Sequence, residues 1–187
     1  MSSMRELTSP ATTVLWLPAT AVDAMRHEAQ QHEPSATGGI LLGYWTDTTT
    51  VVVTDVVDGG PNARREPDGF APDAEYQAVR VAELYDSSNR FHTYLGDWHS
   101  HPRGLLALSR TDRRTIRRIS RFAAARCAVP VMLLVGGRAA DGTAVWDLAA
   151  WSFDRTRERR LSPLLTHVCR QDDVSAVSAD RRPHGTS

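Results

Sequence analysis

The most evident absence in this sequence of 187 residues is lysine, because all 22 of its basic residues are arginine. The arginine-favouring codon usage of a GC-rich genome is the simplest explanation. Acidic residues also number 22, so the formal net charge at pH 7 is zero. A chain without excess positive charge has no long-range field to attract a nucleic-acid backbone or an anionic lipid surface. We therefore expect neither nucleic acid nor a membrane among its partners.

Cysteine is scarce as well. Cys127 and Cys169 lie far apart and form no Cys-x-x-Cys motif, which argues against a disulfide framework and against a cysteine zinc site. No apolar run approaches the roughly 18 residues that a membrane span needs, and the stretch MSSMRELTSP at the N-terminus lacks the apolar centre of a signal peptide. These absences predict a soluble, cytoplasmic protein.

What is present is an ordinary globular composition, 41% hydrophobic and 24% charged, which predicts one hydrophobic core. Apolar and β-branched runs predict strands at residues 14–17, 38–45, 50–57, 90–101, 131–135 and 144–153. Helical periodicity and capping residues predict helices at residues 20–33, 73–88 and 109–127. Their expected inward faces comprise Val22, Met25 and Ala29, then Tyr76, Val79 and Leu84, then Ile116, Ile119, Phe122 and Ala123.

The order of these elements predicts the fold class. Strands and helices alternate irregularly, with hairpins at both ends, so we expect an α/β protein of the α+β kind. Its central sheet would be mixed, mostly antiparallel and flanked by helices. Residues 58–73 hold five glycines or prolines before Phe70 and predict an exposed, functional loop. We expect residues 1–165 to form one domain and the polar residues 166–187 to form a flexible tail.

The segment Gly96–Asp112 carries the chemistry. On a strand, His99 and His101 point to the same face with Cβ atoms roughly 7 Å apart, close enough to meet one ion. Asp112 follows in the first turn of the next helix and can add a carboxylate oxygen. Two histidines and one carboxylate leave the fourth tetrahedral position open, as in catalytic zinc sites. Ser109-x-x-Asp112 alone is an ordinary helix cap and His-x-His alone is often incidental, but their joint spacing favours a metal site.

These residues also resemble a known family. HSHP, six intervening residues and SRTD are similar to the signature of the JAMM (MPN+) metalloproteases, zinc isopeptidases that include deubiquitinases. Thr37–Gly43 resembles the family's glycine-rich core strand, while Asp73–Gln77 and Tyr94–His99 resemble its prokaryotic branch. The likeness spans roughly residues 12 to 155. That branch includes peptidases encoded beside homologues of ubiquitin-activating and ubiquitin-conjugating enzymes in bacterial defence operons.

The resemblance implies an MPN/JAMM-like fold and a zinc-dependent isopeptidase or peptidase. Such an enzyme removes a ubiquitin-like protein from a target or matures its C-terminus, here as part of bacterial antiphage defence. The implied cofactor is Zn²⁺, bound by His99, His101 and Asp112, and Ser109 would donate a hydrogen bond to the oxyanion of the tetrahedral intermediate. The implied partners are a ubiquitin-like protein with its C-terminal tail and, as further candidates, the activating and conjugating enzyme homologues.

Substrate binding would involve the two loops that flank the metal motif. Residues 58–73 and 103–108 are our candidates for gripping an extended peptide tail as an added strand.

The absence of lysine has a second explanation besides codon usage. A chain without lysine would largely escape modification by a conjugation system that acts on lysine.

One position departs from the family. The glutamate that acts as general base precedes the glycine-rich strand directly, where this chain has Ala36. Three explanations stay open: an engineered glutamate-to-alanine substitution, natural loss of the base, or Glu33 in that role through a shifted loop, which Pro34 makes awkward. Glu28 is predicted to lie on the solvated face of its helix.

The alternatives to a protease are a non-catalytic zinc-bearing module that binds a ubiquitin-like tail and a small-molecule amide hydrolase.

Overall fold

A closed barrel of seven strands forms the centre of the fold. The computed structural model describes residues 12–67, 69–102, 106–138, 144–156 and 160–174. The main sheet closes in the order β1-β3-β2-β6-β7-β8-β9. Its strands are β1 (Val14–Pro18), β2 (Gly38–Trp45), β3 (Thr50–Val57), β6 (Thr93–His101), β7 (Val131–Arg138), β8 (Ala144–Asp154) and β9 (Arg160–Cys169). The remaining elements are α1 (Ala19–Gln31), β4 (Arg64–Glu66), β5 (Gly69–Ala71), α2 (Ala74–Ser87), α3 (Arg110–Ile119) and the 3₁₀ turn Ala123–Ala125.

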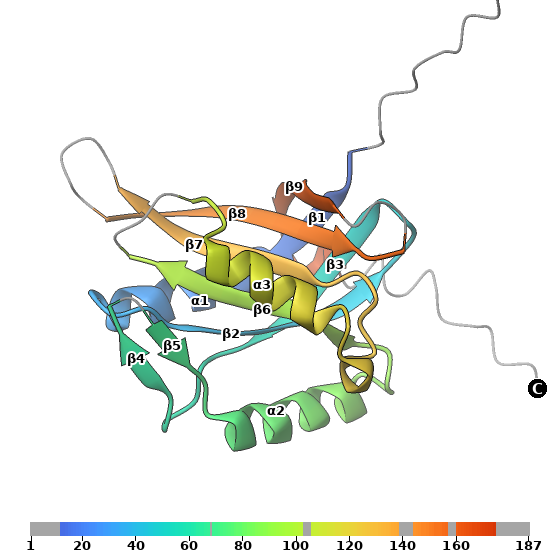
Figure 1. The fold of residues 1–187 in the computed structure, drawn as a ribbon. Helices are drawn as coiled ribbons and strands as arrows, with labels where there is room; N and C mark the ends of the chain where they lie inside the picture. Colours follow the sequence, from blue (N-terminus) through green and yellow to red (C-terminus); the bar gives the residue numbers. More distant parts are fainter. Residues whose placement is uncertain (1–11, 68, 103–105, 139–143, 157–159, 175–187) are drawn as a thin grey trace, which may run out of the picture.

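Strand pairing in the barrel is mixed, which confirms the predicted α+β class. β1 runs parallel to β3 and β9, and β6 runs parallel to β7, whereas the other four neighbouring pairs are antiparallel. The expectation of a central sheet flanked by helices is wrong in one respect, because the sheet closes on itself. Closure depends on β9 returning beside β1 (Figure 1). Only Leu164 and Cys169 of β9 are buried, so no clear strand pattern marks it in the sequence.

The C-terminal boundary also needs correction. The predicted flexible tail includes Thr166–Cys169, yet these residues complete β9 and pair with Leu15–Pro18 of β1. Val174 beyond them is only 3% exposed and packs in a cluster with Tyr44. The domain therefore extends beyond residue 165, and the rest of the expected tail, residues 175–187, lies outside the described residues.

The helices pack on the barrel to different extents. α1 buries Val22, Met25 and Ala29 as predicted, in one cluster with the barrel core. In α2, Asp73 is the N-cap as predicted, but Val79 is 53% exposed and Gln77 is the buried residue. The Gln77 side chain donates a hydrogen bond of 2.8 Å to the Asp58 carbonyl, so the inward face of α2 carries a polar contact.

α3 is shorter than predicted. It ends at Ile119 instead of continuing to Cys127, and the Ser120 hydroxyl donates to the Arg117 carbonyl at 2.9 Å beside its last turn. Ile116 and Ile119 are buried as predicted, whereas Phe122 is 64% exposed and does not join the core. Figure 1 shows α3 crossing in front of β6 and β7.

The expected loop 58–73 carries structure of its own. β4 and β5 form a small antiparallel hairpin in which Arg65 pairs with Phe70. Figure 1 places this hairpin beyond the barrel, in the part of the chain that leads into α2.

Within the described part of the chain, we find no helix with the length and apolar character that crossing a membrane requires.

Candidate metal centre

The two histidines of the motif are presented by β6. This strand lies between β2 and β7, and Gly38 of β2 stands opposite His99. A Cβ atom on Gly38 would lie 2.7 Å from the Cβ of His99, so only glycine allows this approach of the two strands. Trp98 points the other way into the core, where it is 1% exposed and its Nε1 donates to the Val57 carbonyl at 3.1 Å. Strand alternation therefore sends both imidazoles to the same face.

The carboxylate of the motif is presented by the first turn of α3. Ser109 and Asp112 form a capping box: the Ser109 Oγ accepts from the Asp112 N–H at 3.2 Å, and the Asp112 Oδ2 accepts from the Ser109 N–H at 2.6 Å. Capping and metal binding are compatible here. The backbone bond holds Oδ2, while Oδ1 of the same carboxylate faces His99 at 3.1 Å. The cap fixes the direction in which Asp112 points.

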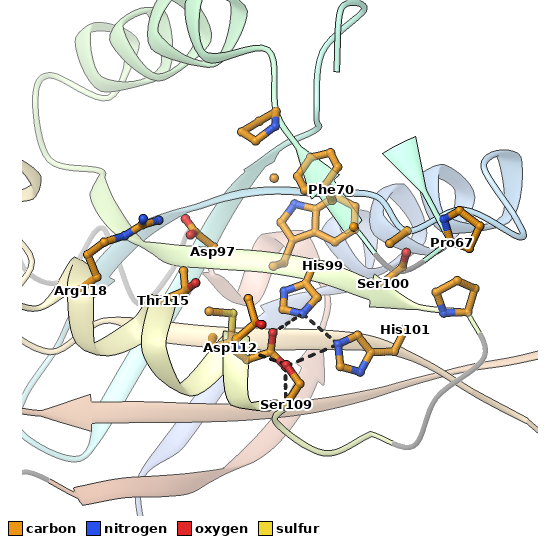
Figure 2. Close-up of a pocket in the computed structure, with 18 of the residues that line it drawn as sticks. Pro67, Phe70, Asp97, His99, Ser100, His101, Ser109, Asp112, Thr115 and Arg118 are labelled. Atoms are coloured by element: carbon orange, nitrogen blue, oxygen red, sulfur yellow. Dashed lines mark hydrogen bonds and ion pairs between the residues drawn. The ribbon is translucent and has the colours of Figure 1, made fainter. Parts of the chain in front are cut away.

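His99, His101 and Asp112 converge on one point (Figure 2). The two Nε2 atoms lie 2.9 Å apart, and the His101 Nε2 lies 3.6 Å from Asp112 Oδ2. Ligands at zinc distances of about 2.1 Å in tetrahedral geometry stand about 3.4 Å apart. The observed separations bracket that value, and two imidazoles with one carboxylate form a donor set that zinc accepts. The residues present fit a metal ion of this kind.

The Asp112 carboxyl is held in its ionised form. Burial by itself raises the pKa of Asp112, but the hydrogen bond and charge of His99, together with the bonds to Ser109, hold that pKa well below its usual range. Asp97, which lies on β6 with the two histidines, differs from Asp112. Burial raises the pKa of Asp97, even though the Tyr94 hydroxyl donates to its Oδ1 at 2.7 Å. Asp112 is therefore an anionic ligand candidate at neutral pH.

A hollow of about 680 Å³ surrounds the three side chains. Pro67, Gly69 and Phe70 of the β4–β5 hairpin line one wall, and α3 lines the opposite wall with residues that include Arg118. Ser109 and Ala36 also line the hollow, so position 36 borders the candidate metal centre. The structure thus brings five of the six predicted site positions together: Ala36, His99, His101, Ser109 and Asp112.

The sixth predicted position, Glu33, lies elsewhere. It is exposed in the turn that follows α1, and it is not among the residues that line the hollow. The backbone N–H of Ala36 donates to the Glu66 carbonyl at 2.9 Å, which joins this segment to the hairpin. The geometry therefore associates position 36 with the hollow more closely than it does Glu33.

The prediction that Glu28 is a solvated residue is wrong. Its side chain is 15% exposed, and its Oε1 accepts from the Thr37 hydroxyl at 2.8 Å and from the Arg65 Nη2 at 3.0 Å. His32 lies 3.3 Å from the same oxygen. This cluster ties the β4–β5 hairpin to α1 and β2. The available signal was the position of Glu28 between Met25 and Ala29, at the edge of the buried face of α1.

Ser100 is a second positioning residue that the sequence did not identify. It is fully buried between the two histidines in the chain, and its Oγ accepts from the Thr37 N–H at 2.9 Å. Its own N–H donates to the Thr37 carbonyl at 2.7 Å. These two bonds hold Thr37, and with it the neighbouring position 36, against β6.

Comparisons with known proteins identify relatives of this chain. A family model for prokaryotic homologs of the JAB domain matches residues 18–165. The probable metalloprotease y4qB of Sinorhizobium fredii is 38% identical over 149 residues, 79% of this chain and 88% of that protein. A CD-NTase/cGAS isopeptidase of Enterobacter hormaechei is 27% identical over 142 residues, 72% and 76% of the two chains. A solution structure from Desulfitobacterium hafniense has a similar fold, with a TM-score of 0.61, 18% identity and coverage of 84% of this chain and 94% of that one.

Proposed function

This chain belongs to the family of prokaryotic homologs of the JAB domain, and from that premise we propose that it is a zinc-dependent peptidase or isopeptidase. The observation that carries the proposal is the convergence of His99, His101 and Asp112 at one point of an open hollow. Relatives named as a metalloprotease and as isopeptidases support hydrolysis of an amide bond. Zinc is the metal we propose, because three protein ligands with an open fourth position are typical of catalytic zinc.

In this proposal His99, His101 and Asp112 hold the ion, and Ser109 acts on the substrate. When bound, zinc supplies Lewis acidity that lowers the pKa of a coordinated water and polarises a carbonyl. Because the Ser109 Oγ already accepts from the Asp112 N–H, its own proton remains available for a developing oxyanion. The capping box thus positions both a metal ligand and a hydrogen-bond donor.

The substrate we propose is a ubiquitin-like protein, released from a target or matured at its C-terminus. The hollow lies between the β4–β5 hairpin and α3, and a peptide tail could add to the hairpin as a further strand. The isopeptidase names of the relatives and the likeness to a branch found in defence operons support this class of substrate. A role in antiphage defence, beside activating and conjugating enzyme homologues, is part of the same proposal.

The alanine at position 36 determines how fast we expect this chain to hydrolyse a substrate. Its methyl group cannot carry a proton, and loss of a general base typically costs on the order of 10²- to 10⁴-fold in rate. The chain with alanine at this position is therefore expected to be slow or inactive as a protease. Whether alanine is engineered or natural at this position would be settled by the codon in the encoding gene. The second candidate function is a zinc-bearing module that holds a ubiquitin-like tail without cutting it, which the alanine at position 36 favours.

The test compares Ala36→Glu with the original chain and with Ala36→Gln, which matches glutamate in size but transfers no proton. Substrates are a ubiquitin-like protein fused through its tail to a reporter and the same protein linked to a lysine side chain. We expect turnover only in Ala36→Glu. Tail binding without turnover in all three forms would favour the binding module. Ready cleavage by the original chain, abolished by Glu33→Gln, would instead assign the base to Glu33.

Metal analysis tests the centre separately. We expect about one zinc per chain in the original and in both position-36 variants, because Ala36 is not a ligand. The double variant His99→Ala, His101→Ala should lose the metal because two of its three ligands are gone. An unchanged zinc content in that double variant would contradict the site.

A further inference from the structure

A strongly basic surface borders the hollow on its α3 side. We define the arginine face as the side chains that line a second, shallow hollow along this helix: Arg110, Arg113, Arg114, Arg117, Arg118 and Arg121. All six residues are exposed. Arg118 lines both this hollow and the one around the candidate metal centre, so the two surfaces are continuous.

Most of the arginine face is not neutralised within the described part of the chain, where Arg118 alone of the six faces a carboxyl group, that of Asp97 (Figure 2). None of the ion pairs there involves any of its six guanidinium groups. Arg113 and Arg117 bond to backbone carbonyls of their own segment, and Arg117 lies 5.7 Å from the centre of the Phe153 ring. Asp112, the acidic residue of α3, points into the candidate metal centre instead.

The spacing of these arginines works against the helix itself. Arginines three and four residues apart, such as Arg110, Arg114 and Arg117, are neighbours of like charge and repel one another. Arg110 also stands at the positive N-terminal end of the helix dipole, where a basic side chain is unfavourable. Arg117 and Arg118 lie in the last turn, where the helix dipole favours basic side chains, but helix stability does not account for the other four arginines, because any polar residue would serve on the outer side.

An exposed aromatic residue stands at the end of the face. Phe122 is 64% exposed and follows Arg121 directly, and its N–H bonds to the carbonyls of Arg118 and Ile119. Arginine together with an aromatic anchor is typical of protein interfaces, whereas isolated charges are not. The combination indicates a partner that offers both carboxylates and an apolar side chain.

We propose that the arginine face and Phe122 dock a short acidic segment of the protein substrate, next to the bond that enters the hollow. α3 has ten residues and is therefore about 15 Å long, which matches about five residues of extended chain. Guanidinium groups pair with carboxylates through two parallel hydrogen bonds, which suits aspartate and glutamate side chains. Naming the partner as the substrate rests on the proposed function, while the docking itself requires no hydrolysis.

A protein segment fits this surface better than nucleic acid does. The whole chain has zero net charge, so its basic surface is local and short. Sequence-independent binding of single strands uses several aromatic platforms along a basic groove, and Phe122 is the exposed aromatic residue at this one. The continuity with the candidate peptidase centre through Arg118 further favours a polypeptide.

The experiment measures binding without catalysis. A fluorescein-labelled peptide of alternating aspartate and glutamate with one central leucine is titrated with metal-free protein and followed by anisotropy. Matched probes are a peptide with asparagine and glutamine in place of the acids and a single-stranded oligonucleotide of the same charge. The variant Arg114→Glu, Arg121→Glu reverses two charges on the face. Its control, Arg80→Glu, Arg170→Glu, makes the same change in net charge at exposed arginines on α2 and after β9.

We expect the acidic peptide to bind in a salt-dependent manner and the neutral peptide not to bind. Reversal of Arg114 and Arg121 should weaken binding about tenfold or more, the control about twofold or less, and Phe122→Ser severalfold with an unchanged melting temperature. Absence of acidic-peptide binding, or equal loss in the control, would overturn the proposal. Tighter oligonucleotide binding would assign the face to nucleic acid, and self-association abolished by the charge reversal would assign it to a second copy. Because zinc and turnover are not needed, failure here leaves the proposed hydrolysis standing, and failed hydrolysis leaves this result intact.

Discussion

Replacing Arg65 with lysine tests whether the β4–β5 hairpin is held in place by one polar cluster. The guanidinium of Arg65 donates to Glu28 Oε1 at 3.0 Å, to the Thr37 hydroxyl at 3.1 Å and to the Gly60 carbonyl at 3.1 Å. Its side chain is 14% exposed. Lysine keeps the charge but has a single ammonium group, which cannot reach all three acceptors from one position. The substitution therefore removes hydrogen bonds without removing the ion pair.

The magnitude follows from those contacts. Each hydrogen bond to a charged group is worth about 1.5–3 kcal/mol when buried, and this cluster is partly exposed, so losing two of them should cost about 2 kcal/mol. In a domain of this size that corresponds to a fall in melting temperature of about 4–8 °C. Arg65→Met also leaves the Glu28 carboxylate without its arginine partner, and we expect a larger loss of about 3 kcal/mol.

Urea unfolding at pH 7 provides the measurement, with Arg64→Lys as the matched control because Arg64 is the exposed neighbour on the same strand. The control should change stability by less than about 0.5 kcal/mol. A double-mutant cycle of Glu28→Gln with Arg65→Met should give a coupling energy of about 1–2 kcal/mol. Since Phe70 of the hairpin lines the hollow, Arg65→Lys should raise KM in the Ala36→Glu background while zinc content is unchanged. Equal stability of Arg65→Lys and the original chain, with zero coupling, would refute this reasoning.

Three further predictions concern separate parts of the molecule. Burial, reinforced by the charge of Asp97, raises the pKa of Cys127 to about 12, so its thiol should resist iodoacetamide at pH 8 until urea unfolds the chain; rapid labelling of the native protein would contradict this. The hydrogen bond with His92 lowers the pKa of Asp55 in the folded protein. The ionised carboxylate therefore stabilises the fold above the unfolded-state pKa of about 4, and this contribution is lost as pH falls through the lower, folded-state pKa. The difference in unfolding free energy between Asp55→Asn and the original chain should shrink in acid. Lysines placed at Arg80 and Arg170 should become acceptors in a mixture with activating and conjugating enzymes, whereas equal modification of both chains, or none, leaves codon usage as the explanation for the missing lysine.

The sequence by itself determined the features that depend on near neighbours. The β-branched run Thr50–Val57 and the apolar stripe of α1 are local patterns, and both elements form where those patterns predicted them. The caps at Asp73 and Ser109 were readable for the same reason, since a capping side chain bonds to a backbone group three residues away. The spacing of the candidate metal ligands is local too, because strand alternation and one short connection bring them together.

Only the tertiary structure decided what depends on residues far apart in the chain. Barrel closure joins β1 to β9 through backbone hydrogen bonds, which leave little trace in the hydrophobic pattern of β9. Glu28 is a largely buried hydrogen-bond acceptor and not the predicted surface residue, because Arg65, from a hairpin far along the chain, lies beside it. The exposure of Phe122 follows from the early end of α3, which turns that ring away from the core. Local periodicity cannot encode such pairings, because the free energy that selects them comes from contacts formed only when the whole chain has folded.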